Sequence, residues 1–207
     1  MTKLLVIKSS VTGAASVTNG LIDRLVDRLR VEVPGLSVTE RDLDAAPVPH
    51  LSSATLGGIG RGEMGEGSAA TRVLSDAMIA ELQEADMLVI GAPMYNFGIP
   101  STLKSWFDHV LRAGVTFQYG ADGPKGLVRP KPVVVVEARG GLYSEGPASV
   151  MDAQEPHLKG MLGFMGLGDV EFVRIERLAF GPDVAGPAIE AAALKLAGIE
   201  LTPALAA

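Results

Sequence analysis

The feature that most constrains this sequence is a set of short, uninterrupted apolar runs separated by longer, mixed stretches. Three of these runs cover residues 4–7, 87–90 and 133–136. A strand that is apolar on both faces must be covered on both faces, as the inner strands of a parallel sheet are. The runs therefore predict three buried strands at the centre of one sheet.

The stretches between the runs have helical spacing. Within residues 16–33, Leu21, Leu25, Val26 and Leu29 recur among charged residues, which is typical of an amphipathic helix. The complete pattern predicts strands over 3–9, 36–41, 86–92, 132–137 and 169–176, and helices over 16–33, 71–84, 100–112, 154–165 and 184–196. Strands and helices that alternate in this way form a parallel sheet with helices on both faces.

Five strands in this alternation predict an α/β fold with a flavodoxin-like, doubly wound five-stranded parallel sheet of order 2-1-3-4-5. The chain has 207 residues, so we expect a single domain of this class over residues 1–207. In such sheets, ligands bind beyond the carboxyl ends of the strands. The loops after the first, third and fourth strands are therefore the candidates for a binding site.

Charge and composition exclude several classes of protein. The formal net charge is −6, so a broad basic surface for nucleic acid is absent. The chain has no cysteine, which excludes disulfides, thiol nucleophiles and cysteine-ligated metals, and we expect no metal site. No apolar run approaches the roughly 18 residues of a membrane span, and residues 4–7 are too few for a signal peptide. We expect a cytoplasmic protein with no membrane partner.

The loop after the first strand is rich in hydroxyl groups. Ser9, Ser10, Ser16 and Thr18 lie where the chain passes from a strand into a helix. The free amides at a helix N-terminus bind anions, and serine and threonine add neutral donors. Ser16 alone would be explained as a helix cap, but the four residues together predict a site for a single phosphate group.

The loops after the third and fourth strands have a different chemistry. Residues 92–100 read Ala-Pro-Met-Tyr-Asn-Phe-Gly-Ile-Pro, which suits the edge of a flat ring as well as it suits a buried aromatic turn. Gly140 and Gly141 follow the fourth strand, and they allow either a close approach to a ligand or a tight turn. The first is favoured, because this is the third such loop at the same edge of the sheet. The glycines of residues 57–62 follow no predicted strand, so we expect a mobile surface loop there rather than a dinucleotide site.

These segments together resemble the FMN-dependent NADH-azoreductases, also called FMN-dependent NADH:quinone oxidoreductases. The resemblance covers nearly the whole chain. It rests on the residues Leu-Leu-Val-Ile-Lys-Ser-Ser of 4–10, Ala-Pro-Met-Tyr-Asn-Phe of 92–97, Arg-Ala-Gly-Val-Thr-Phe of 112–117 and Arg-Gly-Gly of 139–141.

The resemblance implies a homodimer with FMN at the subunit interface, NADH or NADPH as the reductant, and quinones and azo compounds as acceptors. The flavin carries the chemistry, so no residue is expected to be catalytic. The implied cofactor-binding residues are Ser10, Ser16, Val17, Thr18, Pro93, Met94, Tyr95, Asn96, Phe97, Ala138, Arg139, Gly140 and Gly141. We expect Phe117, Tyr119, Tyr143 and Phe164 to bind the acceptor. For Phe117, Tyr119 and Phe164, packing in the core is an equal alternative.

The chain departs from the family's pattern at three positions. Members often carry a polar residue in place of Val17 and a serine in place of Ala138, and some carry a histidine in place of Tyr143. Two other functions remain open on the same fold, a non-enzymatic flavodoxin-like electron carrier and an NADPH-dependent FMN reductase. The mean hydropathy of +0.29 fits either a large core or an apolar surface buried between subunits.

Overall fold

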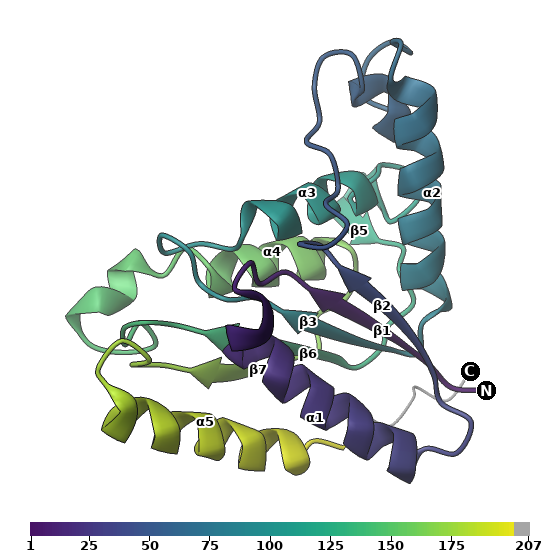
Figure 1. The fold of residues 1–207 in the computed structure, drawn as a ribbon. Helices are drawn as coiled ribbons and strands as arrows, with labels where there is room; N and C mark the ends of the chain where they lie inside the picture. The colour runs from purple at the N-terminus through teal and green to yellow at the C-terminus, as the bar shows by residue number, and fades with distance from the viewer. Residues whose placement is uncertain (201–207) are drawn as a thin grey trace.

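A five-stranded parallel sheet forms the centre of the computed structural model, which describes residues 1–200 (Figure 1). Its strands are β1 (Lys3–Lys8), β2 (Ser37–Asp42), β3 (Met87–Gly91), β6 (Val133–Ala138) and β7 (Val170–Ile175). Their order in the sheet is β2-β1-β3-β6-β7, and all four pairings are parallel. The predicted order 2-1-3-4-5 is confirmed. The single domain predicted over 1–207 includes residues 201–207, which lie outside the described residues.

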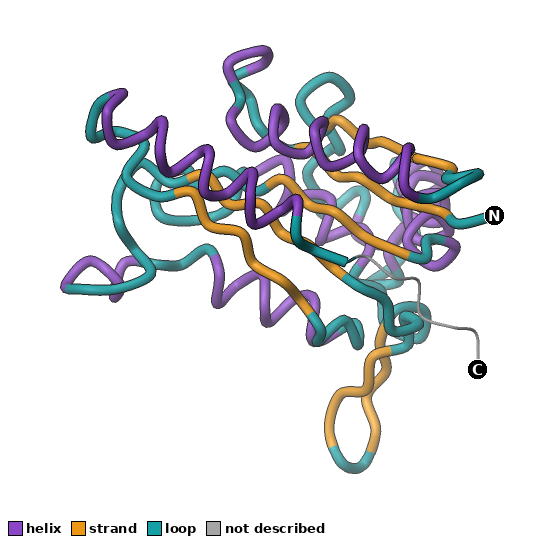
Figure 2. Tube along the Cα trace, turned by 90° about the horizontal axis from the view of Figure 1, so that it is seen from below, coloured by secondary structure: helices purple, strands orange, loops and turns teal. Residues whose placement is uncertain are grey.

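Helices cover both faces of this sheet (Figure 2). They are α1 (Val17–Glu32), α2 (Ser68–Glu84), α3 (Ser101–Val110), α4 (Glu155–Phe164) and α5 (Pro182–Ala197). Successive side chains of a strand point to opposite faces. Leu4 and Val6 of β1 accordingly pack with α1 and α5, while Leu5 and Ile7 pack with α2, α3 and α4.

The segment before α2 differs from the expected mobile surface loop. It contains a short 3-10 helix, η2 (Leu56–Ile59), in which Gly57, Gly58 and Ile59 are buried. A Cβ atom on Gly57 would lie 2.1 Å from the carbonyl oxygen of Glu63, and one on Gly58 would lie 2.6 Å from that of Ser68. The glycines thus allow backbone to pack against backbone at the start of α2, and the expectation was wrong for this part of the loop.

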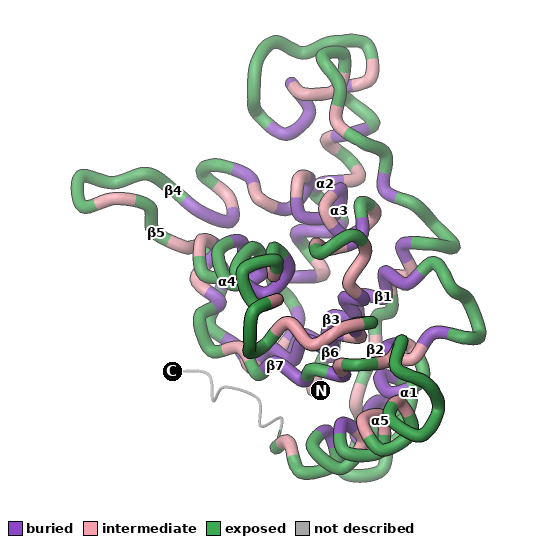
Figure 3. Tube along the Cα trace, turned by 90° about the vertical axis from the view of Figure 1, so that its left-hand side faces the viewer, coloured by how far each residue is buried: buried purple, intermediate pink, exposed green. Residues whose placement is uncertain are grey.

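A two-stranded hairpin projects from the body of the molecule (Figures 2 and 3). It consists of β4 (Phe117–Gly120) and β5 (Gly123–Gly126), which pair antiparallel on either side of a turn at residues 121–122. The base of the hairpin is held against the end of α4, because a Cβ atom on Gly126 would lie 2.2 Å from the amide nitrogen of Gly166.

All five strands of the sheet end at the same edge, on the left in Figure 1. β1, β3 and β6 are neighbours, so the loops that follow them meet although they are far apart in the sequence. Gly91 at the end of β3 brings α1 close, since a Cβ atom there would lie 2.8 Å from Cδ1 of Ile22. No helix among residues 1–200 is long and apolar enough to cross a membrane.

Candidate functional site

A cavity of about 180 Å³ lies where the loops after β1, β3 and β6 meet. Every predicted cofactor-binding residue lines it except Asn96, Phe97 and Gly141. The full lining is Ser10, Thr12, Ala15, Ser16, Val17, Thr18, Pro93, Met94, Tyr95, Ala138, Arg139, Gly140 and Leu178. The fold therefore joins the three loops that the sequence singled out into one site.

One end of the cavity is the N-terminus of α1. The Ser16 hydroxyl accepts the N–H of Asn19 at 3.1 Å and lies 3.0 Å from the Thr18 hydroxyl. Ser16 therefore caps the helix and also lines the cavity. The amides of Val17 and Thr18 open the helix, where N–H groups have no intrahelical partner, and the first turn has no acidic residue. This end of the cavity suits an anion.

Tyr95 links this end of the cavity to the loop after β3. Its hydroxyl accepts the N–H of Val11 at 3.1 Å and lies 3.4 Å from the hydroxyl of Ser10. Ser10 in turn lies 3.0 Å from the hydroxyl of Thr12. The Tyr95 hydroxyl is thus used in joining two loops.

The loop after β3 makes a strained turn. The N–H of Tyr95 donates to the carbonyl of Gly98 at 3.0 Å, and the N–H of Gly98 donates back at 3.1 Å. The two residues between them, Asn96 and Phe97, have φ angles of 48° and 69°. Asparagine tolerates this left-handed region, but a bulky residue rarely adopts it. Strain of this kind persists where the surroundings impose it and is common at ligand sites.

Phe97 is also exposed, with 40% of its surface accessible, and it meets the Tyr143 ring edge to face at a centroid distance of 5.9 Å. The alternative of a buried aromatic turn therefore does not describe this residue. Tyr143 in turn lies over Gly141, because a Cβ atom on Gly141 would be 2.8 Å from Cζ of the Tyr143 ring. The glycine thus makes room for Tyr143, a function that the sequence did not indicate.

The structure encloses the side chain of Arg139 within the protein. It is completely buried, and its guanidinium donates to Gln154 at 3.0 Å and to Glu137 at 2.7 Å. Ion pairs to Asp152 at 3.1 Å and to Glu176 at 3.3 Å complete its surroundings. Since the side chain is enclosed by these groups, Arg139 meets the cavity through its backbone.

Glu137 is the most deeply enclosed acid of this group. Its side chain is fully buried, and its Oε1 atom has no hydrogen-bond partner among the described residues. Burial raises the pKa of Glu137 to about 8, despite the opposing charge of Arg139. The neighbouring Glu155 behaves differently: burial opposes its charge, but hydrogen bonds from Arg174 and Lys159 hold its pKa near 2.

The four predicted acceptor residues fall into two groups. Tyr143 lies beside Phe97, near the cavity. The other three gather at the hairpin, where the ring centroids of Phe117 and Phe164 are 4.5 Å apart and those of Tyr119 and Phe164 are 6.2 Å apart. None of these three lines the cavity in the described part of this chain. Phe117 is buried in the core, whereas Tyr119 is 72% exposed.

The comparisons with known proteins agree with this geometry. A family described as having a flavodoxin-like fold matches residues 2–198. An FMN-dependent NADH:quinone oxidoreductase of Hyphomonas neptunium is 48% identical over 98% of this chain and 97% of its own length. The chain belongs to the FMN-dependent NADH:quinone oxidoreductase family. A member from Ralstonia nicotianae is 46% identical over 92% of this chain and 93% of its own length.

Solved structures extend this family assignment to three dimensions. An azoreductase from Bacillus anthracis superposes with a TM-score of 0.86 at 32% identity, over 95% of this chain and 97% of its own. A second B. anthracis structure, an FMN-dependent NADH-azoreductase in complex with FMN, has a TM-score of 0.82 over 95% of this chain and 98% of its own. At 23% identity, that second likeness concerns the fold alone.

Several residues of the site were not predicted. Thr12 and Ala15 line the cavity, and their signal was their place in the hydroxyl-rich loop. Leu178 reaches the cavity from the segment after β7, which the sequence analysis did not consider. Gln154 and Glu176 hold Arg139, and nothing in their local sequence indicates that contact.

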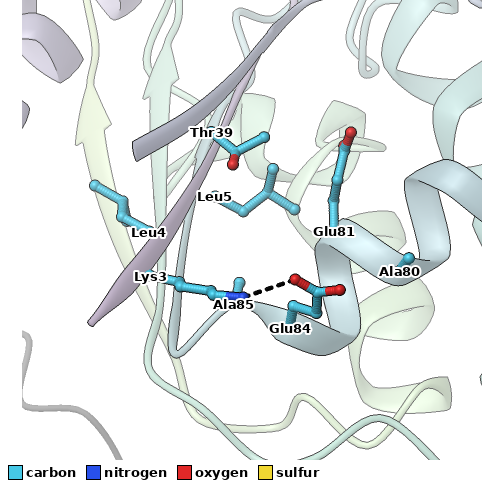
Figure 4. A pocket seen from close by; sticks show the side chains of 8 residues that line it. All are labelled: Lys3, Leu4, Leu5, Thr39, Ala80, Glu81, Glu84 and Ala85. Atoms are coloured by element: carbon cyan, nitrogen blue, oxygen red, sulfur yellow. Dashed lines mark hydrogen bonds and ion pairs between the residues drawn. The ribbon is translucent and has the colours of Figure 1, made fainter. Parts of the chain in front are cut away.

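A second hollow, of about 110 Å³, lies at the opposite edge of the sheet, between β1, β2 and α2 (Figure 4). Its charged side chains pair with groups of the protein: Lys3 with Glu84 at 2.7 Å, and Glu81 with Arg41 at 2.5 Å. It lies at the amino ends of the strands, where parallel sheets do not bind their ligands. Among the described residues, no cluster of three or more histidine or acidic side chains is placed to hold a metal.

The raised pKa of Glu137 predicts how stability depends on pH. The folded protein keeps a proton on Glu137 up to about pH 8, whereas the unfolded chain loses it near pH 4.5. This contribution to the free energy of unfolding is complete below pH 4.5 and is lost as the pH rises to 8. Glu137→Gln removes it, so the stability of the variant relative to the unmodified protein should increase from pH 5 to pH 8.

The measurement is urea unfolding of both proteins at several pH values in that interval. Glu190→Gln is the matched control, because the Glu190 side chain is 70% exposed. Its profile should run parallel to that of the unmodified protein. Parallel profiles for Glu137→Gln as well would mean that Glu137 is ionised in the folded protein throughout.

Proposed function

We propose that this chain is an FMN-dependent oxidoreductase that passes two electrons from NADH or NADPH to quinones and reductively cleaves aromatic azo compounds. The main support for this proposal is the cavity itself. A helix N-terminus with hydroxyl groups forms one end, and the loops after β3 and β6, which we call the ring-side loops, form the other. This cavity occurs in a chain that is 48% identical to a named FMN-dependent NADH:quinone oxidoreductase.

The donor set at the cavity fits FMN. Ser10, Ser16 and Thr18, with the amides of Val17 and Thr18, offer neutral donors and the positive end of one helix, which suits a single phosphate. The loops around Met94 and Gly140 would hold the ring between them. Bound there, FMN supplies the two-electron chemistry, and the protein supplies position and electrostatics.

Among the described side chains that line the cavity, we identify no activated nucleophile and no obvious acid or base. None of the three histidines lines the cavity within the described residues. His109 is buried, with its Nδ1 atom 2.9 Å from the carbonyl of Ser105, and His50 lies 2.9 Å from the hydroxyl of the same serine. These contacts occupy both histidines in holding α3, so the reaction relies on binding and orientation.

We further propose that the protein is a homodimer whose interface completes the site. Two observations support this proposal. The hairpin projects from the subunit, and the exposed ring of Tyr119 on it does not line the cavity of its own subunit. In a two-fold dimer, each hairpin would supply this group to the partner's site. We place the enzyme in the cytoplasm, where its reductant NADH or NADPH is available.

The two alternative functions have weaker support. A non-enzymatic electron carrier docks through a strongly acidic face, whereas the net charge here is only −6 over 207 residues. An FMN reductase of related fold would differ mainly in its preferred nicotinamide. The named relatives are NADH:quinone oxidoreductases, which favours the enzyme that we propose.

Asn96 provides a test of cofactor binding. Asn96→Ala removes an amide expected at the ring edge and also strains the backbone at φ 48° by about 1–2 kcal/mol. Asn96→Gly removes the same amide and accepts the positive φ without strain. Both variants should weaken FMN binding by about 1–3 kcal/mol, the cost of one buried hydrogen bond, in titrations followed by flavin fluorescence.

The glycine variant separates the two explanations. If it binds FMN as tightly as the unmodified protein and only the alanine variant is weakened, the role of Asn96 is to hold the turn.

Extraction of FAD rather than FMN from the purified protein would contradict the proposed cofactor.

The shared site predicts a kinetic pattern. If NADH and the acceptor occupy the same face of the cavity, they cannot bind together, so initial rates against NADH at several quinone concentrations should give parallel double-reciprocal lines. Intersecting lines would contradict the shared site.

Phe164→Ala should change the preference among quinones and azo dyes while leaving FMN affinity nearly unchanged. A loss of FMN affinity equal to that of the Asn96 variants would assign Phe164 to packing.

The dimer has a direct test. Light scattering in the presence of FMN should give about twice the 21.5 kDa mass of the chain. Turnover per subunit should also fall when the protein is diluted below the dissociation constant of the dimer, because each site then loses the partner's hairpin. A monomer that remains fully active at assay dilution would contradict the proposal.

A further inference from the structure

Arg139 lies at a junction between the two ring-side loops. Its Nε donates to Gln154 Oε1 at 3.0 Å, and Nε2 of the same glutamine donates to the carbonyl of Ala92 at 2.6 Å. Ala92 is the first residue of the loop after β3 and immediately precedes Pro93. The main chain of that loop is therefore connected to the Arg139 guanidinium through one side chain.

The other arm of the junction reaches the second loop. Nη1 of Arg139 lies 3.3 Å from Oε1 of Glu176. The same carboxylate accepts the N–H groups of Tyr143 at 2.8 Å and of Ser144 at 2.9 Å, and the Ser144 hydroxyl at 2.5 Å. Tyr143 carries the ring that packs against Phe97, so both ends of this aromatic contact depend on groups around one guanidinium.

A third arm fixes the start of α4. Nη1 of Arg139 lies 3.1 Å from Oδ2 of Asp152, while Oδ1 of that carboxylate accepts the N–H groups of Gln154 and Glu155. The adjacent Ala153 donates its N–H to the carbonyl of Phe97 at 3.0 Å. The residues that hold the strained turn in place thus lie next to the residues that hold Arg139.

This inference rests on the proposed function. We propose that Arg139 is a positioning residue for the flavin ring: its buried guanidinium holds the loop of residues 93–97 and the loop of residues 138–144 at a fixed distance from each other. The side chain is fully buried, and it acts through Gln154 and Glu176. A planar fork with several donors is needed because the acceptors lie in different directions, and lysine lacks that geometry.

Arg139→Lys keeps the charge and removes the fork. With FMN titrated into the full chain, the Kd for FMN should rise about tenfold, the lower end of the cost of removing an outer partner in metal sites. The visible absorption bands and the reduction potential of the bound flavin should shift as well. A residue that contributes only to folding would change the free energy of unfolding and leave these two properties unchanged.

Gln154→Leu is the second variant, and it decides the question if Arg139→Lys does not fold. It cuts the arm to Ala92, and the Nε–H of Arg139 and the carbonyl of Ala92 lose this partner. The carboxylates around the guanidinium still balance its charge. We expect a smaller rise in the Kd for FMN, with a shift of the flavin spectrum in the same direction as in Arg139→Lys.

Arg112→Lys is the matched control. Arg112 is also a buried arginine, but it ties the segment after α3 to Ser75 and Asp76 of α2 and does not line the cavity. It should lose stability and keep the Kd, spectrum and potential of the unmodified protein. Equal shifts in this control, or unchanged flavin properties in folded Arg139→Lys and Gln154→Leu, would overturn the positioning role. Failure of the unmodified protein to bind FMN would instead overturn the proposed function.

Discussion

The burial of β1, β3 and β6 on both faces is the constraint on which the rest of the molecule depends. Strands of this kind need helices above and below the sheet. Each connecting helix carries the chain back to the end of the sheet where the previous strand began, so the next strand runs parallel to it. Parallel neighbours end together, so the loops after β1, β3 and β6 meet at one edge. The cavity forms because of this pairing. The buried strands of the core fix the positions of the loops, although the loops themselves lie outside the core.

The fold could be predicted because its signals are local in the sequence. Runs of four apolar residues identify the inner strands, and apolar residues at helical spacing identify the helix between the first two strands. The error at Gly57 and Gly58 has the opposite cause. These residues have no side chain whose hydrophobicity could reveal burial, and what they pack against is backbone from residues 63 and 68.

The site could be predicted only where neighbours along the chain build it. The hydroxyls around Ser16 lie in one loop, so their convergence on the start of α1 was visible in the sequence. Arg139 beside two glycines resembles a ligand-facing residue, and its burial depends on Gln154 and Glu176, which only the fold brings near. The left-handed backbone of Phe97 was likewise invisible, because phenylalanine carries no preference for it.

The two ends of the cavity are built on different physics. The end that we propose for the phosphate consists of a helix N-terminus and its cap, features that many sequences can form. At the end that we propose for the ring, Phe97 adopts a strained φ, and the Arg139 guanidinium lies among acidic side chains. One of these, Glu137, has an oxygen without a hydrogen-bond partner among the described residues. Strain costs free energy, and a buried ion cluster is seldom more stabilising than a well-packed apolar one. Both features lie beside the loops that we propose to hold the flavin ring, and the positioning role proposed for Arg139 would account for a buried guanidinium at this place.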